Sequence, residues 1–241
     1  MRSVNGAGPI RTLLLIISVH AIITLALHAP VRVTEQNMTI KLPIFDDKRG
    51  LDRILFFSDA VMAISITLLV MDLKVPEALT GLGRALGALW PNYLSYLLSF
   101  FIIGNYWISH HRLFRAIVRY DDRLVLLSLF FLFFVALIPF STKLIALYPA
   151  TRMAVVAYSL NILPLGLISY ALTRHAYVGN RLIDASYGSA DVIKQLNFTR
   201  RGMVIFFICL AVSVAFPPAF LIAWFLGFLG RSIGRRVWKV N

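Results

Sequence analysis

The chain has little of what soluble enzymes and disulfide-rich domains depend on. Only 15% of its 241 residues are charged, and Cys209, within an apolar run, is its one cysteine. A single thiol excludes an intrachain disulfide and a cysteine-rich metal site. Neither an HExxH sequence nor a serine elbow occurs. The usual signatures of metalloproteases and α/β-hydrolases are therefore absent from the sequence. We therefore expect no catalytic residue, no metal and no cofactor, and we interpret the protein as a non-enzyme.

Acidic residues are also scarce, with 11 Asp and Glu against 24 Lys and Arg and a net charge of +13. In a soluble protein this excess would suggest nucleic acid as a partner. Here the basic residues lie between apolar runs, where they act as topology signals of membrane proteins. With 59% hydrophobic residues and a mean hydropathy of +0.78, the composition predicts a polytopic membrane protein that binds no nucleic acid.

Six apolar stretches come near the roughly 20 residues that a helix needs to cross a bilayer. They predict an all-α fold with spans near 54–73, 92–110, 124–142, 153–172, 202–216 and 218–230. Only Pro217-Pro218 separates the last two, and tandem prolines at the centre of one straight helix would remove backbone donors and clash with the preceding turn. Two short helices joined by a tight turn are favoured, with one tilted and kinked helix as the alternative.

The distribution of basic residues favours the six-span count. Seventeen Lys and Arg lie in alternate connections and in the flanks of the unit 38–230, whereas the opposite set holds four. The positive-inside rule then puts both ends of this six-span unit, including the basic tail 231–241, in the cytoplasm of a multi-pass cell-membrane protein. A single span over 202–230 would put that tail on the wrong side.

Residues 1–37 fit the pattern less well. Thr12 to Ala29 is apolar and follows two arginines, which resembles a signal-peptide core or a short extra span. The segment from Ala26 to Pro30 is a poor cleavage site, because a proline follows the expected scission. An equally good interpretation is that translation begins at Met38 and that residues 1–37 are a dispensable extension.

The first span begins with polar residues and then shows one apolar stripe. Ionisable groups near hydrocarbon usually face a partner or a water-filled path, so Asp59 is a functional candidate. At 100° per residue, one side of the helix forms a stripe within about 60° of Ile64. The stripe comprises Ile64, Thr67, Leu68 and Met71, and it continues toward the start of the helix through Ala60, Phe57 and Arg53. Ser58 and Asp59 project away from it, toward whatever helices flank this one.

Each of these features also has an ordinary structural interpretation. The stripe matches common helix packing, and Ser58 and Asp59 match polar residues of a first helical turn. Arg53 fits an interfacial anchor, and the pair His110-His111 at the end of the second span fits solvated histidines. Periodicity alone leaves these interpretations open.

The motifs themselves resemble a known family. Arg53-x-x-x-Phe57-Ser58-Asp59, followed by Ala63-Ile64-x-x-Thr67-Leu68-Leu69, is similar to the signature of the endolysosomal potassium channel family and its prokaryotic relatives. Tyr106-Trp107-x-x-His110-His111 in the second span is similar to the same family. The likeness covers roughly 50–230. One motif per chain resembles the prokaryotic type, which implies a homotetramer in the lipid bilayer whose first helices line a central pore.

The resemblance also implies roles for single residues. Ile64 matches the narrow hydrophobic constriction, Leu68 and Met71 continue the lining, and Thr67 matches a hydroxyl associated with cation preference. A further set matches residues that bond the first helix to its neighbours. That set is Arg53, Phe57, Ser58, Asp59, Trp107, His110 and His111.

Selectivity must come from side chains, because no Thr-Val-Gly-Tyr-Gly run is present to form a carbonyl filter. A narrow apolar ring makes an ion shed water, which potassium does more readily than sodium. We therefore expect a potassium-permeable channel with weak selectivity over sodium. Two alternatives use Asp59, His110 and His111 differently: a proton pathway or secondary transporter, and an intramembrane enzyme.

Overall fold

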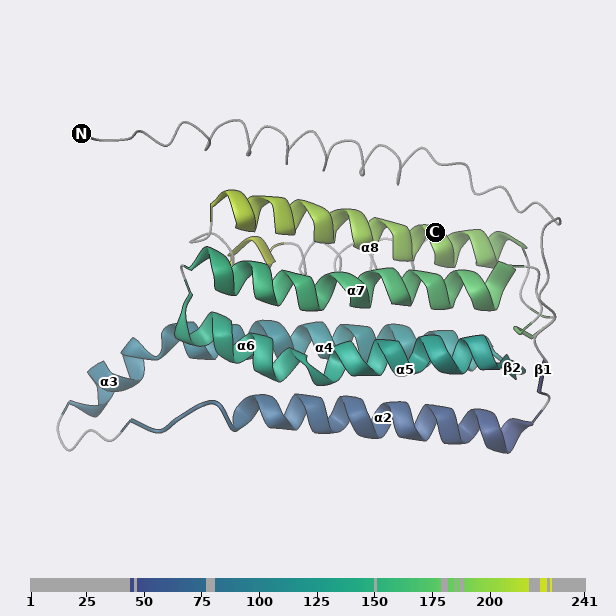
Figure 1. Ribbon diagram of the computed structural model, residues 1–241, viewed down its shortest axis with the longest axis horizontal. Helices are drawn as coiled ribbons and strands as arrows, with labels where there is room; N and C mark the ends of the chain where they lie inside the picture. Colours follow the sequence, from purple (N-terminus) through teal and green to yellow (C-terminus); the bar gives the residue numbers. More distant parts are fainter. Residues whose placement is uncertain are drawn as a thin grey trace, which may run out of the picture.

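The structure, a computed structural model, describes residues 44–45, 47–76, 81–149, 151–178, 182–184, 186, 189–216, 222–224 and 226. The described part of the chain is almost entirely helical. Its elements are β1 (Ile44–Phe45), α2 (Lys48–Val70), α3 (Leu82–Ala88), α4 (Trp90–Ala116), β2 (Tyr120–Asp121), α5 (Asp122–Ala136), α6 (Ile138–Leu147), α7 (Arg152–Tyr177) and α8 (Ser189–Ala215). The long helices lie side by side in one bundle (Figure 1).

Local sequence explains where several helices begin. Asp47 is the N-cap of α2, and its carboxylate accepts hydrogen bonds from the backbone N–H groups of Arg49 and Gly50. Asp121 caps α5 in the same way through the N–H of Leu124, at 2.9 Å. Pro91 and Pro139 stand in the first turns of α4 and α6, where a missing N–H costs nothing.

Most of the predicted spans correspond to described helices. Within the described residues, α2, the pair α5 with α6, and α7 are each long and apolar enough to cross a membrane. The helices α3 and α4 meet at a bend of 50° and together form a fourth candidate. The predicted span 218–230 falls mostly outside the described residues, as do the segments 1–37 and 231–241.

The helix α8 begins earlier than its apolar run indicates. The sequence predicts a span near 202–216 after a connecting loop, but α8 starts at Ser189. Its first half carries Lys194, Arg200 and Arg201. Hydropathy detects only the apolar part of a helix, so a polar extension of the same helix looks like a loop in the sequence.

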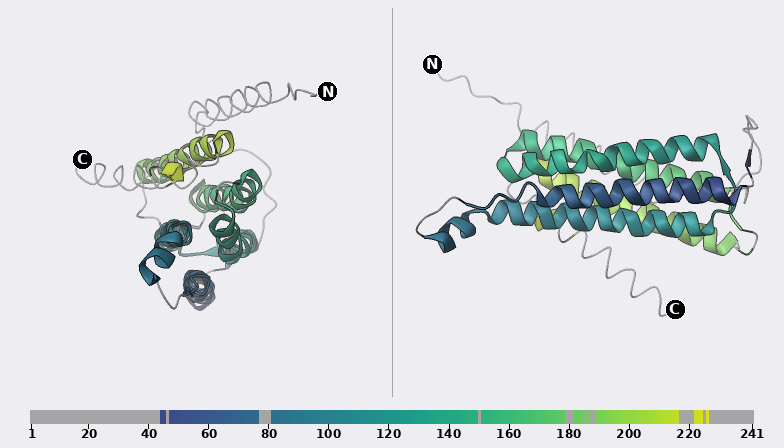
Figure 2. Two further views of the ribbon diagram at one scale, coloured as in Figure 1. Left: turned by 90° about the vertical axis from the view of Figure 1, so that its left-hand side faces the viewer. Right: turned by 90° about the horizontal axis from the view of Figure 1, so that it is seen from below.

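The helix α2 lies at one edge of the bundle. It packs against α4, α5 and α6, while α8 lies at the opposite edge, beyond α7 (Figure 2, left). The buried side of α2 consists of Ser58, Met62, Ser65 and Leu69. This spacing of four, three and four residues places small and large side chains alternately on one face, and small residues allow helix backbones to approach closely in a membrane.

Short backbone pairings close the bundle at the end where α2 begins. The strands β1 and β2 are antiparallel, with Ile44 opposite Asp121, and Ile117 bridges to Ile183. His175 of α7 lies 2.9 Å from the Asp121 carboxylate. These contacts connect the starts of α2 and α5 to the end of α7.

The packing of α2 predicts that truncation of Leu69 destabilises the fold. Leu69 is 1% exposed, and replacement of a buried leucine by alanine costs about 2–5 kcal/mol. We expect Leu69→Ala to lower the thermal midpoint of the detergent-solubilised protein clearly. Leu160→Ala on α7 is the matched control, because Leu160 is 62% exposed and exposed substitutions stay within about 0.5 kcal/mol. Equal midpoints for the two variants would contradict the assigned packing face.

Candidate functional site

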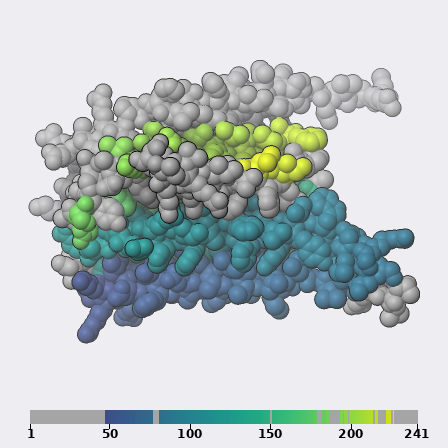
Figure 3. All heavy atoms as spheres, turned by 180° about the vertical axis from the view of Figure 1, so that it is seen from behind, coloured from purple at the N-terminus to yellow at the C-terminus, as the bar shows by residue number. Residues whose placement is uncertain are grey.

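The stripe predicted to line a pore is the face of α2 that its own protomer leaves uncovered. Ile64 is 58% exposed, Leu68 49% and Met71 76%, whereas Met62 and Leu69 on the other face are 1% exposed. Figure 3 shows the side chains of α2, in purple and blue, along one open edge of the molecule. The helix is therefore two-sided, with a packed face and an uncovered apolar face.

Thr67 is the one hydroxyl in the uncovered stripe. Its Oγ1 donates to the backbone oxygen of Ile64 at 2.9 Å. The hydroxyl proton is thereby committed to the helix, so the lone pairs of Oγ1 are available to an outside group. An oxygen with this geometry can contribute to the coordination of a cation.

Asp59 connects α2 to α4. Its Oδ1 accepts a hydrogen bond of 2.9 Å from the indole Nε1 of Trp107. The Trp107 ring in turn stacks on His111, with ring centroids 5.6 Å apart and an interplanar angle of 25°. A carboxylate acceptor makes this bond stronger than one between neutral groups. The bond fixes the rotation of α2 about its own axis relative to α4.

The other residues of the opening motif lie in three different environments. Ser58 is fully buried, and its hydroxyl donates to Ile54 of the same helix at 2.8 Å. Phe57 is 53% exposed. Arg53 is exposed and has no hydrogen bond or ion pair with any side chain that the structure describes.

His110 lies in an aromatic stack and not beside Asp59. Its ring is 4.3 Å from that of Phe114 and 5.4 Å from that of Phe131, centroid to centroid. The side chain is buried, and neither ring nitrogen has a hydrogen-bond partner within the described part of the chain. His110 therefore contributes to the contact of α4 with α5, while Trp107 and His111 belong to the side of α4 near α2.

The structure contains polar contacts that no pattern in the sequence predicts. In the core, Thr142 Oγ1 donates to Ser99 Oγ at 2.7 Å, and the same Ser99 oxygen lies 3.1 Å from the Tyr158 hydroxyl. At the end of α2, Lys143 forms an ion pair with Asp72. A single serine or threonine in an apolar run carries no distinctive signal, which explains why these partners were not found.

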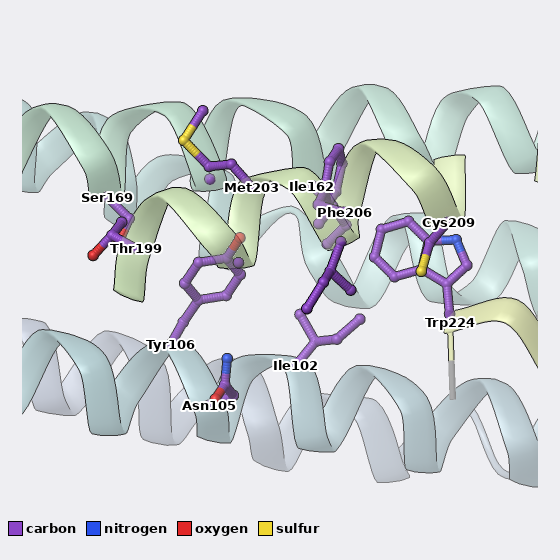
Figure 4. A pocket seen from close by; sticks show the side chains of 13 residues that line it. Ile102, Asn105, Tyr106, Ile162, Ser169, Thr199, Met203, Phe206, Cys209 and Trp224 are labelled. Carbon is purple, nitrogen blue, oxygen red and sulfur yellow. The ribbon is translucent and has the colours of Figure 1, made fainter. Parts of the chain in front are cut away.

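A cavity of about 70 Å³ lies among α4, α7 and α8, away from the edge that α2 occupies. Figure 4 shows Ser169 and Thr199 at one end of it and Cys209 with Trp224 at the other. This volume is enough for a few water molecules, and its lining of mixed polarity suits them. The cavity does not include any residue of the α2 stripe.

The chain is similar to several known proteins. The family model described as "Endosomal/lysosomal potassium channel TMEM175" matches residues 53–139. A potassium channel of Streptomyces collinus is 41% identical over 152 residues, which are 59% of this chain and 74% of the relative. The chain belongs to the TMEM175 potassium channel family.

Two further matches come from Chamaesiphon minutus. A potassium channel of this organism is 34% identical over 168 residues, covering 67% of this chain and 83% of the relative. The crystal structure of a lysosomal potassium-selective channel TMEM175 homolog matches with a TM-score of 0.69 at 29% identity, over 77% of this chain and 98% of that one. The match to the TMEM175 model begins at Arg53 and ends at Pro139, so it covers most of α2, all of α4 and both residues of the Asp59–Trp107 hydrogen bond.

The Asp59–Trp107 contact predicts an energetic coupling between α2 and α4. We expect the destabilisations of Asp59→Ala and Trp107→Phe to be less than additive in the double variant, because either change alone removes the same hydrogen bond. A coupling of about 1 kcal/mol is expected from chemical unfolding of the solubilised protein.

Trp90→Phe supplies the matched control for this double-mutant cycle. Trp90 is 56% exposed at the other end of α4, so its substitution should add to Asp59→Ala without coupling. If the effects of Asp59→Ala and Trp107→Phe are also fully additive in the double variant, the hydrogen bond contributes nothing to the joining of the two helices.

Proposed function

We propose that the protein is a potassium-permeable cation channel, formed by four identical six-span subunits whose α2 helices surround a central pore. The observation that carries this proposal is the two-sidedness of α2. Its motif residues Ser58 and Asp59 lie on or near the packed side, and the stripe around Ile64 remains uncovered by the protomer. Fourfold closed symmetry would bring that stripe from each subunit to one axis.

The stripe suits a side-chain constriction. Ile64, Leu68 and Met71 would form successive apolar rings, and Thr67 would place a hydroxyl oxygen between two of them. A narrow ring of branched aliphatic side chains gates by dewetting and makes an ion shed water for which the ring offers no replacement. Because potassium loses its hydration more readily than sodium, the pore would favour potassium weakly.

The contacts of the polar residues favour a channel over a proton relay or a secondary transporter. A relay through the membrane needs titratable groups that face one path. Here Asp59 is bonded to an indole N–H, and His110 lies between two phenylalanine rings. Neither group belongs to the uncovered stripe. Single-channel current steps in a planar bilayer would separate the channel from a transporter, whose flux saturates and follows a coupled gradient.

The constriction predicts the effect of a polar substitution at Ile64. In liposomes containing the purified protein, we expect Ile64→Asn to raise both potassium and sodium flux several-fold and to reduce the potassium preference, because an amide ring hydrates the narrow point. Ile208→Asn on α8 is the control, since Ile208 is also partly exposed but lies at the far edge of the bundle. Equal potassium and sodium flux in the unmodified protein, together with no effect of Ile64→Asn, would refute the constriction.

The assembly predicts a definite mass in detergent. With one α2 per chain, we expect light scattering of the protein–detergent complex to give a protein mass of four times the 27.1 kDa of the chain. A monomer would leave the stripe of α2 facing lipid and would end the pore proposal.

A further inference from the structure

At the C-terminal end of α2, where the proposed pore would open, the described residues form one ion pair. Lys143 Nζ of α6 lies 2.9 Å from Asp72 Oδ1, and the two side chains are 52% and 26% exposed. Asp72 follows Met71, the last residue of the uncovered stripe, directly in the chain. An exposed ion pair of this kind contributes little to stability. The ion pair matters more for the electrostatic potential at the end of α2 than for stability.

Among the described residues, the charge at this end of the bundle is otherwise positive. This end of the bundle comprises the ends of α2 and α6 and the starts of α3, α4 and α7 (Figure 1). Their basic side chains are Lys74, Arg84, Lys143 and Arg152, and Asp72 is the one acidic side chain among the described residues of this end. The C-terminal carbonyls of α2 add partial negative charge close to Asp72. Of the side chains that the structure describes at this end, the Asp72 carboxylate is thus the one that can attract a cation, and Lys143 neutralises it.

We propose that Lys143 masks the Asp72 carboxylate at the mouth of the pore, so that this pair sets the local cation concentration and thereby the conductance. The inference rests on the proposed channel function and goes beyond it, because it assigns control of cation supply to a pair outside the apolar constriction. In a tetramer, each subunit would contribute one masked carboxylate. In such a tetramer, loss of Lys143 would shift the total charge around the opening by −4, and loss of Asp72 would shift it by +4.

The two single variants therefore have opposite expected effects. We would record potassium currents in planar bilayers at about 10 mM salt, where the screening length is about 30 Å, and at about 1 M, where it is about 3 Å. At low salt, Lys143→Gln should raise the conductance about two- to threefold and Asp72→Asn should lower it by a similar factor, because surface charge concentrates or repels permeant ions. At high salt, both should approach the unmodified protein.

The double variant separates electrostatics from structure. Asp72→Asn with Lys143→Gln restores the original net charge, so its conductance at low salt should return close to that of the unmodified channel. Arg152→Gln removes the same charge as Lys143→Gln from the same end, but from the start of α7, and it should change the conductance less. When the salt concentration is lowered on one side of the bilayer at a time, the effects of the two single variants should appear for one of the two sides only.

The outcomes distinguish this inference from the proposed function. If both single variants reduce the current and the double variant reduces it most, the ion pair acts by stabilising the structure, and the inference is wrong. Unchanged currents in both single variants at low salt also overturn it, and in both cases the channel function stands. If the unmodified protein carries no potassium current at all, the proposed function fails and takes this inference with it.

Discussion

The contacts that hold α2 in the protomer lie on one side of the helix. Between helices in a bilayer the hydrophobic effect gives no driving force, so association depends on close packing and on polar bonds. The serines at 58 and 65 let α2 approach its neighbours, Met62 and Leu69 fill the contact, and Asp59 sets the rotation through Trp107. The face left over is apolar and uncovered, and this face makes α2 the candidate pore helix.

The remaining helices form a support in which several polar side chains bond to one another inside the protein. Ser99, Thr142 and Tyr158 bond to one another across three helices, and Asn161 Nδ2 donates to Ser141 Oγ at 3.0 Å. Buried polar groups without partners are costly in a membrane. The short pairings of β1 with β2 and of His175 with Asp121 close the end where α2 begins. A helix held in this way can present its outer face without deforming.

The segment from Asp59 to Ile64 joins these two roles in a few residues. Asp59 belongs to the support because it binds Trp107. Ile64, five positions later, belongs to the uncovered face. The helical repeat separates them by rotation alone. A motif of this kind specifies the direction of a helix face, and the chemistry of the face itself comes from ordinary aliphatic side chains.

The sequence by itself determined the class of the protein, the approximate positions of up to four candidate membrane spans, and the division of α2 into a polar motif and an apolar stripe. These depend on hydropathy and on the 100° rotation per residue, which are local properties of the chain. Only the tertiary structure decided that Asp59 meets Trp107 and not His110, that Lys143 meets Asp72, and that α8 extends back to Ser189. Asp59 and Trp107 lie 48 residues apart in the sequence. Such pairs form because helices pack at particular rotations and heights, and that arrangement is set by the shapes of all the buried side chains together.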